Sequence, residues 1–201
     1  WSSDVCSSDL LFERIQMPVI TCVLIEGYSE ETRRYLEERL SDAARLAIGA
    51  AWDGITVMIN ELPAANYMRK RGEIIPAIAP HPPAGIVRNY LSAMEARDLD
   101  TAKGYLADDF VMTFPGDVQF QKPEELVEWS KDRYKSVSKK YEFFDEAVNA
   151  DNIIVYCSGT LSGIGLDGEP FSGIRFIDRF AIQDNKISRQ WVWDDLAESM
   201  K

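Results

Sequence analysis

The sequence has very little histidine and cysteine, which excludes several kinds of site. Its 201 residues include one histidine, His81, and three cysteines, Cys6, Cys22 and Cys157. Ser-His-Asp or Cys-His catalysis and polyhistidine metal sites would all depend on His81, which lies in a Pro-rich stretch typical of a solvated linker. The cysteines form no C-x-x-C pair and are odd in number, so neither a zinc site nor a disulfide framework is indicated. We expect no metal and no cofactor.

Positive charge and long apolar runs are also scarce. There are 22 Lys and Arg against 33 Asp and Glu, a net charge of −11, which argues against binding to nucleic acid. No apolar run approaches the roughly 18 residues of a transmembrane helix. Unpaired cysteines fit a reducing compartment. The sequence therefore predicts a cytoplasmic protein with a small-molecule partner, and neither nucleic acid nor a membrane.

Residues 1–16 differ from the rest of the chain. They read WSSDVCSSDLLFERIQ, with the unit SSD occurring twice, and lack the basic and apolar regions of a secretory signal. The segment resembles translated adapter sequence, and we expect it to be a non-native leader; the alternative is a genuine disordered extension. The natural start would then be Met17, followed at once by Pro18.

Residues 17–72 predict a small β-α-β unit. The β-branched run Pro18–Ile25 is typical of a buried strand, and Ser29 is a candidate N-cap for a helix that ends near Ile48. A second strand is predicted at Ile55–Asn60, which gives a parallel pair with a right-handed crossover. Two strands and fewer than about 60 residues bury too little surface to be stable alone. We therefore expect self-association or docking on another domain.

This unit resembles the 4-oxalocrotonate tautomerase family. The resemblance is carried by Met17-Pro18, the turn Glu26-Gly27, the strand ITVMINE and the segment LPAANYMRK. It implies that the initiator Met is removed and that the Pro18 amine is catalytic, moving a proton between carbons of an enol or dienol. A free α-amine titrates at about 7.7–8.0, and burial in an apolar pocket favours its neutral, basic form. Pro18 within a longer chain is an amide and has no such basicity.

The same resemblance implies four substrate-binding residues. The two arginines of the family correspond here to Tyr28 and Thr56, so a dicarboxylate substrate is not expected. Tyr67 stands at the position of an aromatic wall, and Arg69 would supply a replacement cation. Tyr28 and Asn60 would donate hydrogen bonds to a developing enolate. The alternative is that these are an ordinary turn Tyr, strand-end Asn, interface aromatic and solvated Arg.

A Pro-rich stretch separates a second domain from the first. We assign residues 17–72 to the first domain, residues 73–84 to the linker and residues 85–201 to the second domain. Helical spacing starts near Ile86, recurs in residues 96–110, and recurs again from Pro123 to about Tyr134. A short strand and turn are predicted at Val111–Gly116, and further strands after about Lys139, with tight turns at residues 166–169 and 183–186. The expected fold class is α+β, with three helices on a curved antiparallel sheet in the second domain.

The second domain resembles the SnoaL-like branch of the nuclear transport factor 2-like superfamily. The phrases IVRNYLSAMEARDLDTAKGYLADDF, GIRFIDRFAIQDNKI and WVWDDL carry the resemblance. It implies a cavity between the concave face of the sheet and the helices. Such domains include cyclases, isomerases and non-catalytic modules that bind ligands or dimerise, so the fold does not fix the function.

Four residues are candidates for this second cavity. Asp178 and Asp194 are possible acid–base groups, Tyr156 a hydrogen-bond donor, and Trp193 part of an aromatic lining. Period-two counting places Asp178 between two phenylalanines on one face of its strand, where desolvation would raise its pKa. The alternative is that Asp178 pairs with an arginine on a neighbouring strand and that Asp194 is solvated.

Three functions follow from these patterns. The first is a tautomerase-type isomerase that uses the Pro18 amine. The second is a non-catalytic protein that binds a small ligand or dimerises, and the third is acid–base chemistry in the SnoaL-like cavity. We expect a homo-oligomer in each case.

Overall fold

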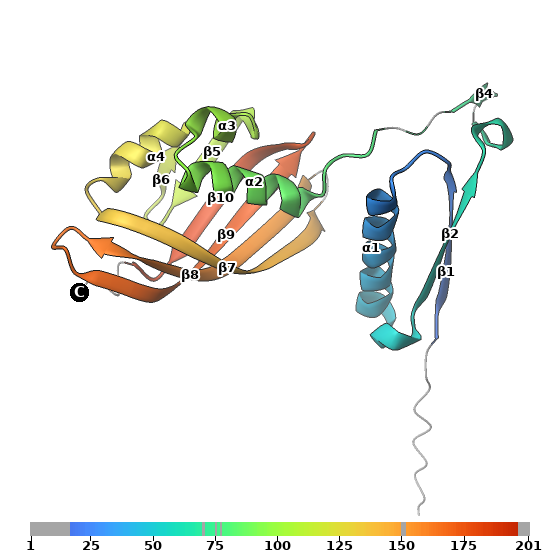
Figure 1. The fold of residues 1–201 in the computed structure, drawn as a ribbon, viewed down its shortest axis with the longest axis horizontal. Helices are drawn as coiled ribbons and strands as arrows, with labels where there is room; N and C mark the ends of the chain where they lie inside the picture. Colours follow the sequence, from blue (N-terminus) through green and yellow to red (C-terminus); the bar gives the residue numbers. More distant parts are fainter. Residues whose placement is uncertain (1–16, 70, 75, 77, 150–151, 197–201) are drawn as a thin grey trace, which may run out of the picture. The chain divides into compact units, whose positions relative to one another are not determined.

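The protein has two compact units, which divide between Ala79 and Pro80. The structure is a computed structural model that describes residues 17–69, 71–74, 76, 78–149 and 152–196 (Figure 1). The expected leader, residues 1–16, lies outside the described residues. Each unit contains both helix and strand, so the predicted α+β class is confirmed.

The first unit is the predicted β-α-β motif. Strand β1 (Val19–Ile25) pairs in parallel with β2 (Thr56–Leu62) along its whole length. Helix α1 (Glu30–Ile48) connects them. The Ser29 hydroxyl accepts a hydrogen bond from the Thr32 N–H at 3.1 Å, which caps the first turn as expected.

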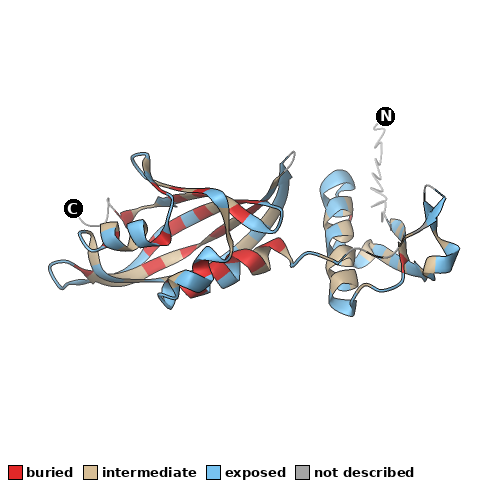
Figure 2. Cartoon of the chain, turned by 90° about the horizontal axis from the view of Figure 1, so that it is seen from above, coloured by how far each residue is buried: buried red, intermediate tan, exposed pale blue. Residues whose placement is uncertain are grey.

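This unit is completed by short elements and has little core. A 3₁₀ turn, η1 (Trp52–Gly54), precedes β2; a second, η2 (Ala64–Asn66), follows it and leads to the hairpin β3 (Met68–Arg69) and β4 (Gly72–Glu73). Among its described residues only Ile25 and Ala50 are fully buried, and Figure 2 shows a unit drawn mostly as exposed or intermediate.

One face of the two-stranded sheet is open and partly apolar. Burial alternates along β1 and β2, and the half-buried side chains are those that face α1. On the other face Val19, Val23 and Met58 are 61%, 51% and 46% exposed. We call these three residues the open sheet face.

The second unit places helices on one side of a six-stranded sheet (Figure 1). The strand order is β6-β5-β10-β9-β8-β7. Its elements are α2 (Pro83–Glu95), α3 (Leu99–Lys103), β5 (Leu106–Phe114), β6 (Val118–Phe120), α4 (Pro123–Ser130), β7 (Tyr134–Asn149), β8 (Asn152–Gly165), β9 (Pro170–Gln183) and β10 (Lys186–Asp194). Helix α2 and the sheet enclose a continuous core that includes Val87, Tyr90, Val155, Phe180 and Ile187.

Three details of this unit correct the expectation. The sheet is mixed, because β10 runs parallel to β5 while the other neighbouring strands pair in antiparallel fashion. β5 already begins at Leu106, inside the region predicted as helix, and Tyr134 starts β7 and is not helical. In both places pairing with a neighbouring strand, Leu106 with Ile187 and Tyr134 with Gly165, prevails over local helical spacing. The two predicted hairpin turns are confirmed: Asp184 and Asn185 have φ of 50° and 62°, as two-residue hairpins require.

Two glycines bring β7 and β8 unusually close. A Cβ at Gly159 would clash with the carbonyl oxygen of Lys140, and one at Gly163 would clash with that of Ser136. Bulges interrupt the ladder nearby, between Tyr141 and Phe143 on β7. The strand pair is therefore bent, which contributes to the curvature of the sheet.

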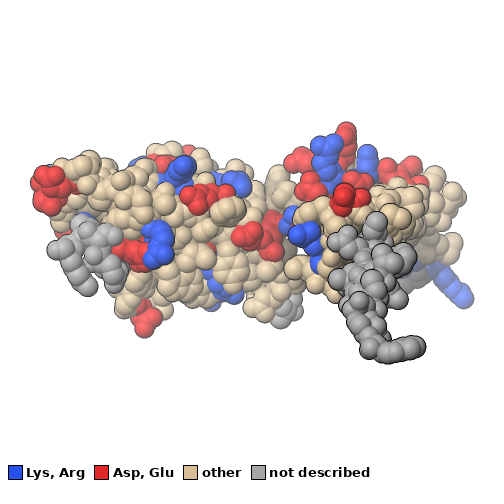
Figure 3. Space-filling view, turned by 90° about the horizontal axis from the view of Figure 1, so that it is seen from below, with Lys and Arg blue, Asp and Glu red and all other residues tan. Residues whose placement is uncertain are grey.

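Charged side chains of both signs are interspersed on the surface. On the face drawn in Figure 3, neither the basic nor the acidic residues form one extended patch. Local pairs such as Arg39–Asp42, at 2.8 Å, account for part of this mixing. Within the described part of the chain, none of the helices is both long and apolar enough to cross a membrane.

Candidate active site

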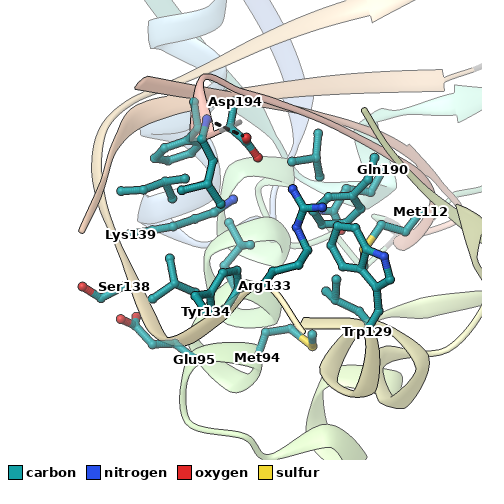
Figure 4. Close-up of a pocket in the computed structure, with 18 of the residues that line it drawn as sticks. Met94, Glu95, Met112, Trp129, Arg133, Tyr134, Ser138, Lys139, Gln190 and Asp194 are labelled. Carbon is teal, nitrogen blue, oxygen red and sulfur yellow. Dashed lines mark hydrogen bonds between the residues drawn. The ribbon is translucent and has the colours of Figure 1, made fainter. Parts of the chain in front are cut away.

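The second unit contains a cavity of about 160 Å³ between its helices and the concave face of the sheet. Apolar and aromatic side chains form most of its wall, including Met112, Phe114, Trp129 and Leu161. Polar groups enter from β7, β10 and the segments after α2 and α4 (Figure 4). An apolar cavity with a few convergent polar groups is the usual form of a small-molecule site.

A buried carboxyl lies behind the wall of this cavity. Asp178, on β9, is 0% exposed and shares its face with Phe176 and Phe180, as period-two counting predicts. The Lys139 ammonium donates a hydrogen bond to its Oδ2 at 2.6 Å. The partner is thus a lysine on β7, and not the arginine considered from the sequence. The Oδ1 atom of Asp178 has no hydrogen-bond partner among the described residues.

A short chain of hydrogen bonds joins this pair to α2. Gln190 Nε2 donates to Asp178 Oδ2 at 3.4 Å, and the Tyr90 hydroxyl donates to Gln190 Oε1 at 3.2 Å. The two bonds together orient the Gln190 amide, with its nitrogen toward Asp178 and its oxygen toward the Tyr90 hydroxyl. Gln190 and Lys139 therefore both present donors to one carboxyl oxygen.

Burial dominates the electrostatics of the site. It raises the pKa of Asp178, although the charge and hydrogen bond of Lys139 oppose the shift. Burial also raises the pKa of Tyr90 and of Tyr141, and raises that of Cys157 to about 12. The tyrosines and the thiol consequently stay protonated at neutral pH. They can therefore donate hydrogen bonds within the site.

Only two of the four predicted cavity residues are on the cavity side. Asp178 and Asp194 share the concave face, and Asp194 lines the cavity. Tyr156 pairs with Arg179, and Trp193 pairs with Ile177. Both partners are sequence neighbours of Asp178, so their side chains point to the face opposite that of Asp178. Successive side chains of a strand point to opposite faces. Tyr156 and Trp193 therefore lie on the other face of the sheet, contrary to expectation.

Lys139, Gln190 and Tyr90 are absent from the site that the sequence predicts. The strand predicted for this region begins only after Lys139, which leaves this lysine without an assigned face. The available signal is the alternation Val137, Lys139, Tyr141, which places a charged side chain at an inward position of an apolar strand face. The pairing of Tyr90 with Gln190 joins residues 100 positions apart, and no local pattern indicates it.

In the first unit, Pro18 lies directly before β1. It is half-buried, and its carbonyl oxygen accepts a hydrogen bond from the Thr56 N–H at 3.0 Å. Tyr28 follows the opposite end of β1, and Tyr67 and Arg69 follow the corresponding end of β2. A seven-residue strand spans about 20 Å. A single chain therefore does not bring Pro18 together with these three residues.

The remaining predicted residue, Asn60, is on the side of β2 away from α1. It pairs with Val23 and belongs to the same exposed surface as the open sheet face. Arg33, near the far end of β1, is already engaged: it donates to the Tyr28 carbonyl at 2.7 Å and pairs with Glu61 at 3.1 Å. Across the residues that the structure describes, no group of three or more His, Cys, Asp or Glu side chains is placed to hold a metal ion.

Solved structures with a similar fold match the second unit. An NTF2-like protein of Burkholderia thailandensis is 18% identical, with a TM-score of 0.51, covering 62% of this chain and 99% of its own. An NTF2-like protein of unknown function from Burkholderia pseudomallei is also 18% identical, with a TM-score of 0.50 and coverage of 59% and 94%. TerC, co-crystallised with polyporic acid, is 15% identical, with a TM-score of 0.50 and coverage of 59% and 96%. At these identities the likeness shows the fold alone.

Family models match both units. The model described as a tautomerase enzyme matches residues 18–73, and that of the SnoaL-like domain matches residues 87–190. No curated protein matches the chain. The tautomerase match supports isomerase-type chemistry on small molecules. The chain belongs to the SnoaL-like family and carries a tautomerase domain ahead of its SnoaL-like domain.

Proposed function

We propose that the protein is an isomerase that moves a proton on an enol or an unsaturated keto acid, with the amine of Pro18 as the base. The observation that carries this proposal is the position of Pro18. The tautomerase match begins at this residue, which is also the last residue before β1. Its carbonyl is fixed to the edge of β2, so the nitrogen occupies a defined place at the end of the sheet.

The chemistry requires that Met17 be removed. The free secondary amine of Pro18 would then titrate at about 7.7–8.0 in water, and burial in an apolar pocket would lower its pKa and increase the share of the neutral form at working pH. The neutral amine takes a proton from the substrate, and the resulting ammonium returns a proton to a different atom. For an enol, the hydroxyl proton is lost and a C–H bond forms, with no net gain or loss of atoms.

We further propose that a second copy of the chain completes this site. Tyr28, Tyr67 and Arg69 lie about 20 Å from Pro18 within one chain, but the same residues of a neighbouring chain can reach it. The open sheet face supports such association, because exposed apolar side chains on a sheet favour burial against a partner. Asn60 lies on that surface and would enter the shared site. Tyr28 and Asn60 would stabilise the enolate oxygen, and Arg69 would hold a carboxylate.

The test compares a chain that begins at Met17 with its Pro18→Ala variant and with the 201-residue chain. Ketonisation of the enol of pyruvate is followed by ultraviolet absorbance, and intact mass establishes the mature N-terminus. Loss of a general base costs about 10²- to 10⁴-fold in rate, so we expect both comparison proteins to lose at least about 100-fold. Equal rates in all three proteins would refute the proposal.

A second candidate is acid–base chemistry in the cavity, through Asp178 or Asp194. The buried Asp178–Lys139 pair favours it, because a desolvated carboxyl with a raised pKa beside the wall of a cavity is a typical candidate for an acid–base group. TerC, of similar fold, was crystallised with polyporic acid, which supports a cavity for small acidic ligands. An activity that survives Pro18→Ala and is lost in Asp178→Asn would favour this candidate. Ligand binding without turnover would favour a non-catalytic module.

A further inference from the structure

The cavity of the second unit is richer in basic groups than its surroundings. Residues 81–201 carry 14 Lys and Arg against 21 Asp and Glu. The cavity wall reverses this balance, with three basic residues, Arg97, Arg133 and Lys139, against two acidic ones, Glu95 and Asp194. Charges that line an apolar cavity act over short distances in a medium of low polarity, so they affect a bound ligand strongly.

Arg133 is the basic residue with the clearest unused capacity. It lies between α4 and β7, and its own N–H donates to the Ser130 carbonyl at 3.0 Å, which fixes the backbone. Its guanidinium carbon is 4.3 Å from the centre of the Trp129 ring, and Figure 4 shows the side chain directed into the cavity. It makes no ion pair with any residue that the structure describes, whereas Arg189 pairs with Asp109. A guanidinium offers a planar fork of donors that matches a carboxylate.

Lys139, on β7, supplies a second donor. Its side chain is 22% exposed, and Figure 4 shows its nitrogen pointing into the same space as the Arg133 guanidinium. The ammonium has three N–H donors, and Asp178 accepts one of them. Asp178 thereby holds the ammonium in place without using all of its hydrogen-bonding capacity.

The volume of the cavity limits the apolar part of the ligand. An apolar cavity of about 150 Å³ is large enough for benzene, and this cavity has about 160 Å³. Met112, Leu126 and Leu161 provide apolar walls, and the Trp129 and Phe114 rings pack against each other at 5.2 Å. One ring or a short unsaturated chain fits this space, and a larger ring system would have to extend through the opening.

We propose that this cavity binds a small aromatic or unsaturated carboxylic acid as its anion. The apolar body lies among the side chains of α4, β5 and β8, and the carboxylate is held between Arg133 and Lys139. This is a statement about binding, so it stands whether or not Pro18 or Asp178 is catalytic. Each unit would then have its own ligand site, since the proposed Pro18 site and this cavity are built from different residues.

The test uses the full chain with benzoate and its neutral counterpart of similar shape, benzamide. Isothermal titration calorimetry gives the dissociation constants. We expect benzoate to bind at least tenfold more tightly than benzamide, because only benzoate can accept charged hydrogen bonds from both basic side chains. Equal affinities, or no binding of benzoate at millimolar concentration, would overturn the proposal.

Paired variants locate the carboxylate. Arg133→Gln and Lys139→Gln should each weaken benzoate at least tenfold and change benzamide less than threefold. Lys135→Gln and Lys140→Gln are the matched controls, since both lysines are exposed on the same strand as Lys139 and do not line the cavity. If Lys139→Gln fails to fold because Asp178 loses its partner, Arg133→Gln decides alone. Unchanged benzoate binding in Arg133→Gln would contradict the proposal.

Discussion

The two units differ in how much of their surface a single chain can bury. The first has Ile25 and Ala50 as its fully buried described residues, and it leaves the open sheet face to solvent. The second packs helices on a six-stranded sheet and encloses both a core and a cavity. One chain forms the cavity by itself, whereas we propose that a second copy completes the Pro18 site. The cavity is complete in one chain, whereas the predicted Pro18 site has its parts at opposite ends of one strand pair.

The largest expected effect is on the core of the second unit. Phe180 is fully buried and meets Tyr90 edge-on, with ring centres 6.1 Å apart. Phe180→Ala should lower the free energy of unfolding by about 3–5 kcal/mol, because it removes a buried ring and leaves a cavity. The matched change Val57→Ala, at a half-buried position of β2, should cost only about 1 kcal/mol. Urea denaturation with hydrogen exchange resolved by unit measures both, and similar costs would erase the contrast.

The next effect concerns pH and is confined to the second unit. Burial raises the pKa of Asp178 in the folded chain, so the folded state holds this proton more tightly than the unfolded one. The resulting stabilisation is complete below the unfolded pKa of about 3.9 and is lost as pH rises through the folded value.

We therefore expect wild-type stability to fall relative to Asp178→Asn as pH rises above about 4. The slope should reach about 1.4 kcal/mol per pH unit at its steepest, since one proton is involved. Urea denaturation of both proteins between pH 4 and pH 8 measures the difference. Parallel curves would show that Asp178 has an ordinary pKa, with Lys139 holding it ionised.

The substitution with the smallest expected effect on chain stability should strongly affect assembly. Val23→Glu changes an exposed side chain of the open sheet face, so the free energy of unfolding of the single chain should move by no more than about 0.5 kcal/mol. Association and Pro18-dependent isomerase activity should both be lost, and benzoate binding should remain. Sedimentation velocity reports the assembly state. Leu46→Glu, at an exposed apolar position of α1, is the control, and a monomeric wild-type chain would rule out the shared site.

The sequence predicts the fold better than it predicts the site, for a physical reason. Caps, hairpin turns and period-two strands are local patterns, and Ser29, Asp184 and Asn185 act as their chemistry requires. The parallel pairing of β10 with β5 depends on strand order across the whole sheet, which no local pattern encodes.

The alternation of side chains along a strand also decides which cavity residues the sequence can predict. Asp178 was identified because period two fixes its face once β9 is recognised. Tyr156 and Trp193 are aromatic residues whose type fits a cavity, but their phase in the strands places them on the other face. Lys139 becomes visible as a site residue only when the start of β7 is known.

The close approach of β7 and β8 at Gly159 and Gly163 has a consequence for how such a cavity can diversify. Lys139 pairs with Leu161, between these two glycines, so its position depends on two residues that have no side chain and do not line the cavity. A larger residue at either glycine would push the strands apart and displace the ammonium. Ligand preference can therefore change during evolution without substitution of any residue that touches the ligand.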